Sequence, residues 1–269
     1  MRKSFRDNKD FTVYDFKTAD YRAIAPNFQS AFWQKHADII PLLGYALDKK
    51  AIVDSVLTGQ GAVAYSPLQM NAEYNDPDVN HRDYNPEFFK QQMAAKGWVL
   101  GSDGIYEKDG EKLSFSVDTR EYETERVDIA QIASSQFKKA GVDMQVHIVP
   151  KLDWKTLESF LIGEAAPFDP DNGTYDLFYT GGSGNYTHYS NPAVDRALAA
   201  ARASYDPAVR KQYYNEFQQA WAQNPAYIMV AYLDGNYVAA KKVTGLSTER
   251  ILGHHAVGVM WNIEDWDIQ

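Results

Sequence analysis

The sequence predicts an α/β fold in which helices pack on a mixed sheet. Segments that favour strands recur along the chain, with amphipathic segments that favour helices between them, and this order of elements is typical of α/β layers. The 269 residues are 45% hydrophobic, enough to bury a sizeable core. Three helix starts are marked by a capping side chain followed by proline. They are Asn85-Pro86, Asn191-Pro192 and Asp206-Pro207.

The first half of the chain is expected to carry short helices and a long loop before its first clear strand. Apolar periodicity, caps and glycine stops place these elements. In chain order they are two extended segments within 11–28 separated by a polar turn, helix 41–47, helix 51–57 capped by Asp48, an ordered loop over 64–84, helix 86–96, a hairpin of 104–107 with 112–117, helix 121–140 and strand 142–149.

The second half is expected to alternate in the same way. Helical spacing of apolar residues, alternation and an Asp-Gly turn mark its elements. In order they are helix 154–162 capped by Asp153, a polar loop over 164–174, strand 175–179, helices 192–203 and 207–223, a hairpin of 226–233 with 236–240 turning at Asp234-Gly235, and a tail over 246–269 without helical periodicity.

Composition excludes several classes of function. The net charge is −9 with scattered basic residues, so nucleic acid is not an expected partner. Cysteine is absent, which excludes disulfides, thiolate catalysis and cysteine-bound zinc. The charged first ten residues lack the apolar stretch of a signal peptide, and no later window could span a membrane. The chain is therefore either a cytosolic protein or a shortened one.

The stretch from Tyr175 to Tyr186 concentrates what a ligand site needs. A short apolar run, interpreted as a buried strand, leads into a glycine-rich turn that carries Ser183, Asn185 and Tyr186. Rigid elements that end in polar loops commonly present binding sites. The alternative is an ordinary surface turn after a strand.

Catalytic and metal sites are not favoured by the sequence. Asp169 and Asp171 could form a glycosidase acid/base pair, but carboxylates two apart in a loop usually cap turns. Gly181-Gly-Ser-Gly-Asn185 lacks the last glycine of a nucleophile elbow. No two of the six histidines have helical ligand spacing, and His254 and His255 are expected to point apart on a strand. We therefore predict no catalytic residue, no metal ligand and no cofactor, with a hydrolase using Asp169 and Asp171 as the alternative.

Several collinear motifs resemble one family, the extracytoplasmic solute-binding proteins of ABC importers in the peptide- and nickel-binding class (family 5). The helix motif of the family is similar to Tyr45-Ala-Leu-Asp-Lys49 with Ile52-Val53 and Gly59. Further matches follow in order to the end of the chain. They are Tyr84-Asn-Pro-Glu87, Gly97-Trp98, Asp103-Gly104, Asp109-Gly110-Glu-Lys-Leu113, Ala140-Gly141-Val142, Trp154, Tyr175-Asp176-Leu177, Tyr189-Ser-Asn-Pro192, Asp195 and Trp261-Asn-Ile-Glu-Asp-Trp266.

The resemblance covers about the C-terminal half of such proteins, which are two-lobed clamshells. It implies that residues 1–245 form the second lobe and that the tail 246–269 returns to the missing first lobe. It also implies capture of an oligopeptide, dipeptide or metal-chelate solute rather than catalysis. The implied partners are the ligand, a membrane-embedded ABC permease and the N-terminal lobe. The implied location is periplasmic or membrane-anchored outside the cytoplasm, with the secretion signal in the missing half.

Within the family, the loop after a buried strand lines the cleft, and the resemblance places Thr180, Gly181, Gly182, Ser183, Asn185 and Tyr186 there as ligand-binding residues. Peptide-binding members carry Gly-Trp and, three residues later, an Asp that pairs with the peptide amino terminus. Gly182 stands at the Trp position and Asn185 at the Asp position. A neutral amide cannot offer the charge-assisted bond that an ammonium prefers, so another mode of capture is expected.

A rival register makes Phe160-Leu-Ile162 the strand and Ala165–Pro170 the site loop, with Asp169 supplying a carboxylate. Both registers keep the site within 164–186. With the opposing lobe absent, residues 1–245 are expected to fold but to bind ligand weakly. The tail is expected to lie back on the lobe or to promote self-association through its apolar residues.

Overall fold

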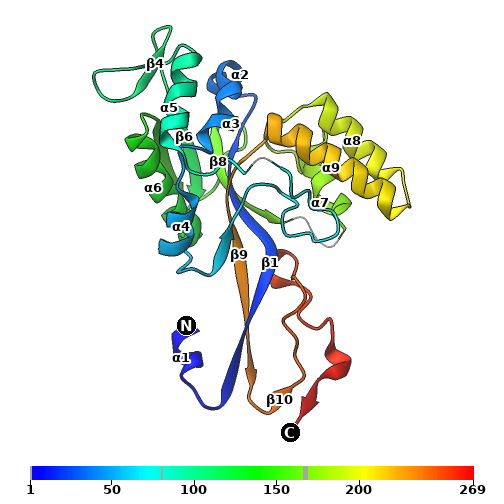
Figure 1. Ribbon diagram of the computed structural model, residues 1–269. Coiled ribbons are helices and arrows are strands. Elements are labelled where there is room, and N and C mark those ends of the chain that lie inside the picture. Colours follow the sequence, from blue (N-terminus) through cyan, green and yellow to red (C-terminus); the bar gives the residue numbers. More distant parts are fainter. Residues whose placement is uncertain (1, 80, 166–168) are drawn as a thin grey trace.

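A computed structural model describes residues 2–79, 81–165 and 169–269, and it shows a six-stranded mixed sheet at the centre of the molecule (Figure 1). The strand order is β2-β9-β1-β8-β6-β7. The bounds are β1 Phe11–Pro26, β2 Gly61–Val63, β6 Ser114–Arg120, β7 Asp143–Val149, β8 Ser159–Ala165 and β9 Ile228–Ala240. β1 pairs antiparallel with β8 and β9, whereas β6 pairs parallel with β7 and β8. The predicted α/β class with a mixed sheet is confirmed.

Helices cover both faces of this sheet (Figure 1). One group packs on one face, over strands from β2 and β9 across to β6 and β7, and the other packs on the opposite face. The first group is α2 Ala31–His36, α3 Ile40–Leu43, α4 Lys49–Ser55, α5 Pro86–Ala95 and α6 Thr124–Lys139, and the second is α7 Asp171–Phe178, α8 Pro192–Arg202 and α9 Pro207–Gln223. Short elements complete the chain. They are α1 Arg2–Arg6, the 3-10 turns Ala37–Ile39, His254–Ala256 and Ile263–Asp265, and the strands β3 Val99–Leu100, β4 Tyr106–Lys108, β5 Glu111–Lys112, β10 Val243–Thr244 and β11 Asp267–Ile268.

The helix starts marked by a cap and proline are confirmed. Asn85, Asn191 and Asp206 each accept main-chain N–H hydrogen bonds in the first turn of α5, α8 and α9. Proline suits the first helical position because the N–H that it lacks would have no partner there. A cap followed by proline therefore marks a helix start within a few neighbouring residues. The Asp48 cap of α4 is confirmed as well.

Two predicted elements are wrong, helix 154–162 and strand 175–179. Residues 159–165 form β8 instead, and residues 171–178 form α7. Phe160 and Ile162 face one core and Leu161 the other, so the run is apolar because both faces of β8 are buried. Such a run cannot be told from a buried helix by periodicity. The rival register had the strand correct, although residues 166–168 of its loop lie outside the described residues.

The predicted hairpin over 226–240 is also wrong, as is the break within 11–28. β9 runs straight through Asp234-Gly235, and β1 is one strand with irregular pairing between Lys17 and Tyr21. Lys17 Nζ lies 2.9 Å from Asp234 Oδ2, and Gly235 pairs with Phe16 across the two strands. Cross-strand pairing therefore overrides the turn signal, and β1 and β9 extend below the sheet as an arm (Figure 1).

The hairpin expected over 104–117 belongs to two sheets. Its turn at Asp109-Gly110 joins β4 to β5 in a small sheet with β3, while β6 is part of the large sheet. Residues 64–84 contain no helix or strand where they are described, as expected.

The tail lies along the arm formed by β1 and β9 (Figure 1). Leu252 bridges to Thr18, and Phe16, Leu252 and Val259 form a small apolar cluster. Within the described residues, helices are too short or too polar to cross a membrane. The tail therefore brings residues 252–256 next to the middle of β1, where the sheet gives way to the arm.

Candidate functional site

A pocket of about 340 Å³ opens where β8 leaves the sheet. It gathers side chains from five separate parts of the chain. They are Arg120, Glu123 and Arg126 around the start of α6, Glu164 at the end of β8, Trp154 and Tyr186 from two loops, and His254 and His255 from the tail. Pockets that combine apolar walls with a few converging polar groups are the common form of ligand sites.

An aromatic pair forms the rim of this pocket. The rings of Trp154 and Tyr186 lie 4.8 Å apart, and Trp154 meets Phe160 edge to face at 4.9 Å. Trp154 is 43% exposed and Tyr186 48% exposed, although both are large enough to gain from burial. The same two rings also line a larger pocket of about 670 Å³ with Ser183 and Asn185. An amphipathic surface between two hollows is suited to holding a ligand.

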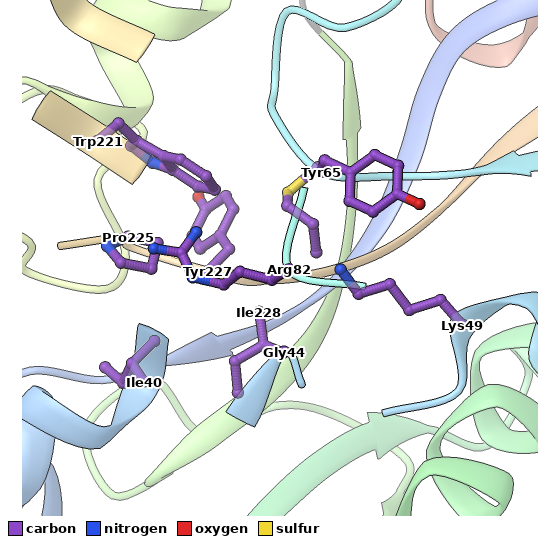
Figure 2. A pocket seen from close by; sticks show the side chains of 10 residues that line it. Ile40, Gly44, Lys49, Tyr65, Arg82, Trp221, Pro225, Tyr227 and Ile228 are labelled. Atoms are coloured by element: carbon purple, nitrogen blue, oxygen red, sulfur yellow. The ribbon is translucent and has the colours of Figure 1, made fainter. Parts of the chain in front are cut away.

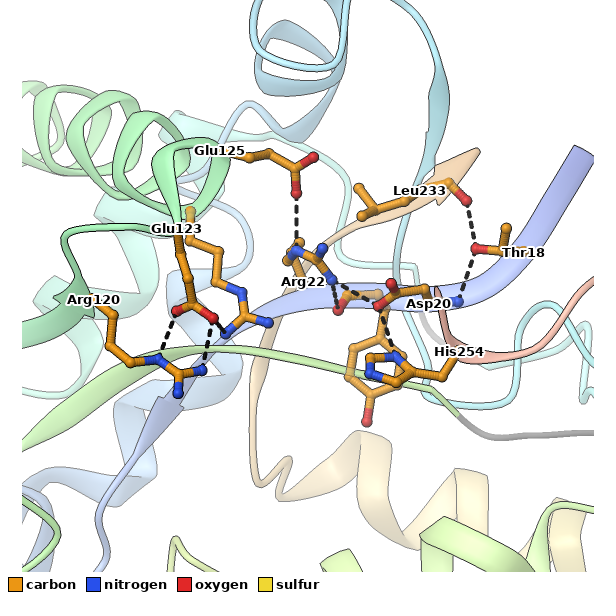
Figure 3. A network of polar contacts seen from close by, with 10 residues as sticks. Thr18, Asp20, Arg22, Arg120, Glu123, Glu125, Leu233 and His254 are labelled. Atoms are coloured by element: carbon orange, nitrogen blue, oxygen red, sulfur yellow. Dashed lines mark hydrogen bonds and ion pairs between the residues drawn. The ribbon is translucent and has the colours of Figure 1, made fainter. Parts of the chain in front are cut away.

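A charged network supports the floor of the site (Figure 3). Arg22 Nη1 donates to Asp20 Oδ1 at 2.7 Å, and its Nε donates to Glu125 Oε1 at 2.9 Å. Burial opposes ionisation of Asp20, but the neighbouring His254 imidazole and Arg22 guanidinium hold its pKa below the ordinary value. Because Asp20 and Arg22 are both buried, this pair anchors β1 beneath the pocket.

A second part of the network surrounds Glu123. Arg120 donates two hydrogen bonds to its carboxylate, at 3.0 and 2.6 Å, and Arg126 Nη1 lies 2.7 Å from Oε1. Burial lowers the pKa of Arg126, and the charge of Arg22 lowers it further. A Cβ at Gly163 would come within 2.6 Å of Arg22 Nη1, so glycine leaves room for the guanidinium groups to lie against β8.

Glu164 is the one carboxylate of the pocket wall without an ion pair among the described residues. Burial raises its pKa above the ordinary value. A half-buried carboxyl beside guanidinium groups gives the pocket both signs of charge.

Of the residues predicted from the sequence, only Tyr186 lines the pocket at the end of β8. Thr180 donates from its main-chain N and Oγ1 to the Asp195 carboxylate, at 2.8 and 2.7 Å, so it is tied to α8. Gly181 has φ +76°, and a Cβ on Gly182 would collide with the main chain of Asp176. Both glycines therefore serve the turn, and Ser183 lines the larger pocket of about 670 Å³.

Asn185 is buried, and the expectation that its amide is exposed is wrong. Its Nδ2 donates to the carbonyls of Tyr179 and Tyr189, at 3.0 and 2.8 Å. Its Oδ1 accepts from Thr187 Oγ1 at 3.1 Å and from the Tyr189 N–H at 3.0 Å. The side chain therefore holds the loop together.

Replacing Asn185 by alanine is expected to lower the free energy of unfolding by about 2 kcal/mol, because buried partners of the amide lose their hydrogen bonds. Urea denaturation measures the change. Ser183→Ala is the matched control, since this side chain in the same loop is exposed, and it should change stability by less than about 0.5 kcal/mol. Equal effects of the two substitutions would contradict a structural role for Asn185.

The residues that the sequence analysis missed are Trp154, Glu164, Arg126, Asp20 and the two histidines. The rival register placed its strand within β8, but its site loop began at Ala165, one residue after Glu164. His254 and His255 were expected to point apart, but they lie on a 3-10 turn with stacked rings 3.7 Å apart. These site residues come from segments far apart in the sequence, so no single stretch of the chain indicates the site.

Asp169 and Asp171 do not form an acid/base pair. Each binds a different arginine, Asp169 with Arg210 and Asp171 with Arg202 at 2.9 Å. Burial by itself would raise the pKa of Asp169, but the hydrogen bond from Arg210 keeps it below its ordinary value. A general acid requires the opposite shift, so the geometry does not support the hydrolase alternative.

A smaller pocket lies between α3, α4 and the end of α9 (Figure 2). Its volume of about 20 Å³ accommodates roughly one water molecule. Lys49 reaches it and donates to the Ala64 carbonyl at 3.3 Å. This pocket is too small for a solute. Lys49 is therefore considered below for its effect on stability rather than as a residue that binds the solute.

An α/β lobe with a charged, aromatic-rimmed pocket at one end of its sheet is typical of proteins that bind small ligands. The chain belongs to the bacterial extracellular solute-binding proteins of family 5, whose model, described as the middle part of that family, matches residues 2–197. The resemblance inferred from the motifs is thereby confirmed.

Relatives of known name agree with this membership. Protein XP55 of Streptomyces lividans is 31% identical over 93% of this chain and 47% of its own length. The oligopeptide-binding protein AppA of Bacillus subtilis is 31% identical over 82% of this chain and 42% of its own. The nickel-binding periplasmic protein of Escherichia coli is 21% identical over 71% of this chain and 38% of its own. This chain spans about half the length of the curated relatives that it matches.

Solved structures show the same fold. NikZ from Campylobacter jejuni in complex with Ni(L-His) superposes with a TM-score of 0.87 at 34% identity, over 99% of this chain and 55% of NikZ. Bacillus subtilis AppA in complex with a nonapeptide superposes with a TM-score of 0.81 at 26% identity, over the whole of this chain and 54% of AppA. The expected lobe of a periplasmic-binding-protein-like fold is confirmed.

Proposed function

We propose that this chain captures a small solute for an ABC importer and holds it in the pocket at the end of β8. In this proposal it acts outside the cytoplasm, in the periplasm or anchored to the membrane, and passes its ligand to a membrane-embedded permease. It carries out no catalysis. Membership of family 5 supports the proposal. The observation on this chain that carries it is the exposed ring pair Trp154 and Tyr186 above a charged pocket.

The ligand we propose is a peptide or metal-chelate type solute. AppA was solved with a nonapeptide and NikZ with Ni(L-His). The pocket offers guanidinium, carboxyl and imidazole groups below an aromatic rim, and these groups match a small molecule that carries both signs of charge.

We further propose that residues 1–245 act as one lobe of a clamshell and that the tail 246–269 contacts a second lobe. Exposed apolar side chains on the tail support this proposal, because isolated proteins rarely leave several together in water. They are Val257, Met260, Ile263 and Ile268, each more than half exposed.

The aromatic rim provides a test. Calorimetric titration with a nonapeptide and with the nickel–histidine complex should identify a binding ligand. The double substitution Trp154→Ala and Tyr186→Ala should weaken its binding by about 2 kcal/mol, or roughly 30-fold, through loss of ring contacts. Tyr205→Ala is the control, since that ring is fully exposed between α8 and α9. Unchanged affinity in the double variant would place the ligand elsewhere.

A further inference from the structure

The small pocket between α3, α4 and the end of α9 gathers positive charge in the interior of the lobe (Figure 2). Lys49 enters it from the start of α4, and Arg82 enters it from the loop that precedes α5. Among the described residues that line this pocket, these two side chains carry a formal charge at neutral pH and the others are neutral. The described wall of the pocket therefore holds two cations and no carboxylate.

Lys49 has few partners for its charge. The residue is 6% exposed, and its ammonium donates one long hydrogen bond, of 3.3 Å, to the Ala64 carbonyl. The ammonium also lies 4.8 Å from the centre of the Tyr65 ring. The nearby Asp83 carboxylate accepts a hydrogen bond of 2.7 Å from the Tyr65 hydroxyl rather than pairing with Lys49. An ammonium has three protons to donate, so at least one of them has no acceptor among the described residues.

Arg82 adds a second positive charge. Its guanidinium donates to the main-chain carbonyl of Ala222 at the end of α9. Burial, with a smaller contribution from the charge of Arg82, lowers the pKa of Lys49 to about 7. Burial also lowers the pKa of Arg82. Two like charges withdrawn from water raise each other's energy, so the pocket favours an occupant of opposite charge.

Trp221 contributes a donor that lacks an acceptor. Its side chain also lines the pocket and is 1% exposed. The indole Nε1 is buried and has no hydrogen-bond partner among the described residues. An indole nitrogen can only donate, so the partner that it lacks is an acceptor. Buried polar atoms without a partner are rare in folded proteins, and a bound water or ion can satisfy them.

The volume and the charge of the pocket together select its occupant. About 20 Å³ holds roughly one water-sized body. A water molecule would accept from these donors but would leave both charges uncompensated, whereas an anion supplies an acceptor and the opposite charge. Sulfate, phosphate and carboxylates have several atoms and exceed this volume. The pocket therefore suits an anion of a single atom.

We propose that this pocket binds one chloride ion, held by the Lys49 ammonium and the Arg82 guanidinium, with the Trp221 indole N–H as a further donor. The ion joins the start of α4, the loop before α5 and the end of α9, which are far apart in the sequence. Its residues are different from those of the pocket at the end of β8, so the site goes beyond the proposed function and does not depend on it.

Nuclear magnetic resonance of chloride tests the proposal in solution. When sodium chloride is added to a halide-free buffer, the wild-type chain should broaden the chloride line, because bound and free ions exchange. Lys49→Met should weaken chloride binding by more than about tenfold, through loss of a charge and a hydrogen-bond donor. Methionine fills a similar volume, so this variant should retain the fold. Lys50→Met is the matched control and should broaden the line as the wild type does, because its side chain is 76% exposed.

Anomalous diffraction locates the ion. Crystals of the wild-type chain soaked in sodium bromide should show an anomalous peak in the pocket beside Lys49 Nζ, and crystals of Lys49→Met should show none there. A water molecule at this position without an anomalous signal would overturn the proposal. A peak of equal height in Lys49→Met would mean an adventitious ion only and would overturn it as well.

Thermal unfolding gives a third readout, because a ligand that binds the folded chain raises its melting temperature. Sodium chloride should raise the melting temperature of the wild type and of Lys50→Met above the value in sodium gluconate at equal concentration, since gluconate is too large for the pocket. The two salts should act equally on Lys49→Met. Equal melting temperatures of the wild type in the two salts, or equal line broadening by wild type and Lys49→Met, would contradict the chloride site.

The chloride site and the proposed function fail separately. Binding of the nonapeptide or of the nickel–histidine complex should be the same in both salts, because the ion lies outside the pocket at the end of β8. Absence of binding of either probe would count against solute capture alone. Absence of the bromide peak and of the chloride broadening would count against the chloride site alone.

Discussion

Replacing Arg22 by methionine is expected to lower the free energy of unfolding by about 3–5 kcal/mol at neutral pH. Asp20 and Arg22 are buried, with side chains 6% and 10% exposed, and the substitution leaves the Asp20 carboxylate without its guanidinium. Removing one member of a buried ion pair is costly because the remaining charge is neither solvated nor paired. Urea denaturation of the two proteins measures the loss.

The pH dependence gives this prediction a signature. The pKa of Asp20 is lowered in the folded protein, so its stabilisation is present above the pKa of the unfolded chain, about 3.9, and is lost as the pH falls through the folded value. Without Arg22, only the His254 imidazole still opposes the effect of burial, so the pKa of Asp20 should rise. The stability difference between wild type and variant should therefore shrink as the pH is lowered towards 4.

Two further proteins control this experiment. Arg6→Met removes an ion pair with Asp15 whose side chains are both more than 40% exposed, so it should cost less than about 1 kcal/mol. Asp20→Asn in the Arg22→Met background removes the orphaned charge and should restore part of the stability. A loss no larger than that of Arg6→Met, or no recovery with Asp20→Asn, would contradict the role of this pair.

Replacing Lys49 by methionine is expected to raise the free energy of unfolding by roughly 2–4 kcal/mol at pH 7. Burial, with a smaller contribution from the charge of Arg82, lowers the pKa of Lys49 to about 7. A shift from 10.5 to about 7 corresponds to at most about 5 kcal/mol, from which the lost bond to the Ala64 carbonyl subtracts about 1 kcal/mol. Methionine fills a similar volume without a charge.

The sign follows from proton counts. Between pH 7 and about 10 the unfolded chain binds the lysine proton and the folded chain does not, so Lys49 makes stability rise with pH by up to about 1.4 kcal/mol per unit. The gain from Lys49→Met should therefore be largest at pH 7 and below, and should decline towards pH 9.

Lys50→Met is the matched control for Lys49→Met. Lys50 is the next residue of the same helix, but its side chain is 76% exposed and pairs with Asp54. Its replacement should change stability by less than about 0.5 kcal/mol at any of these pH values. A destabilising effect of Lys49→Met, or an effect that does not vary with pH, would contradict the claim that burial of Lys49 lowers the free energy of unfolding.

Features fixed by neighbouring residues could be predicted from the sequence. Asn85, Asn191 and Asp206 mark their helices through bonds that close within three residues, so α5, α8 and α9 were predictable. The Asp-Gly turn signal at Gly235 failed because pairing partners more than 200 residues away decide that segment. The same reason explains β8, which lies between β1 and β6 in the sheet and whose apolar residues are buried in the cores on both faces.

The candidate site was less predictable than the fold. Its charged groups belong to β1, α6, β8 and the tail, and only the folded sheet brings them together. The predicted loop over 180–186 supplies Tyr186 to the pocket, while Asn185 proved to be a buried support. The pairing of His254 with His255 depends on a left-handed backbone that sequence alone does not indicate.

Hydrogen–deuterium exchange of the chain with and without the nickel–histidine complex, and in parallel with a nonapeptide, tests the location of ligand capture most directly. We expect slower exchange with at least one of these probes in three segments: 152–157 beside Trp154, 186–189 beside Tyr186, and 252–256 around the two histidines. The exposed loop 203–206 should be unaffected. Protection confined to residues 180–185, or none in any of the three segments with either probe, would contradict a ligand site at the end of β8.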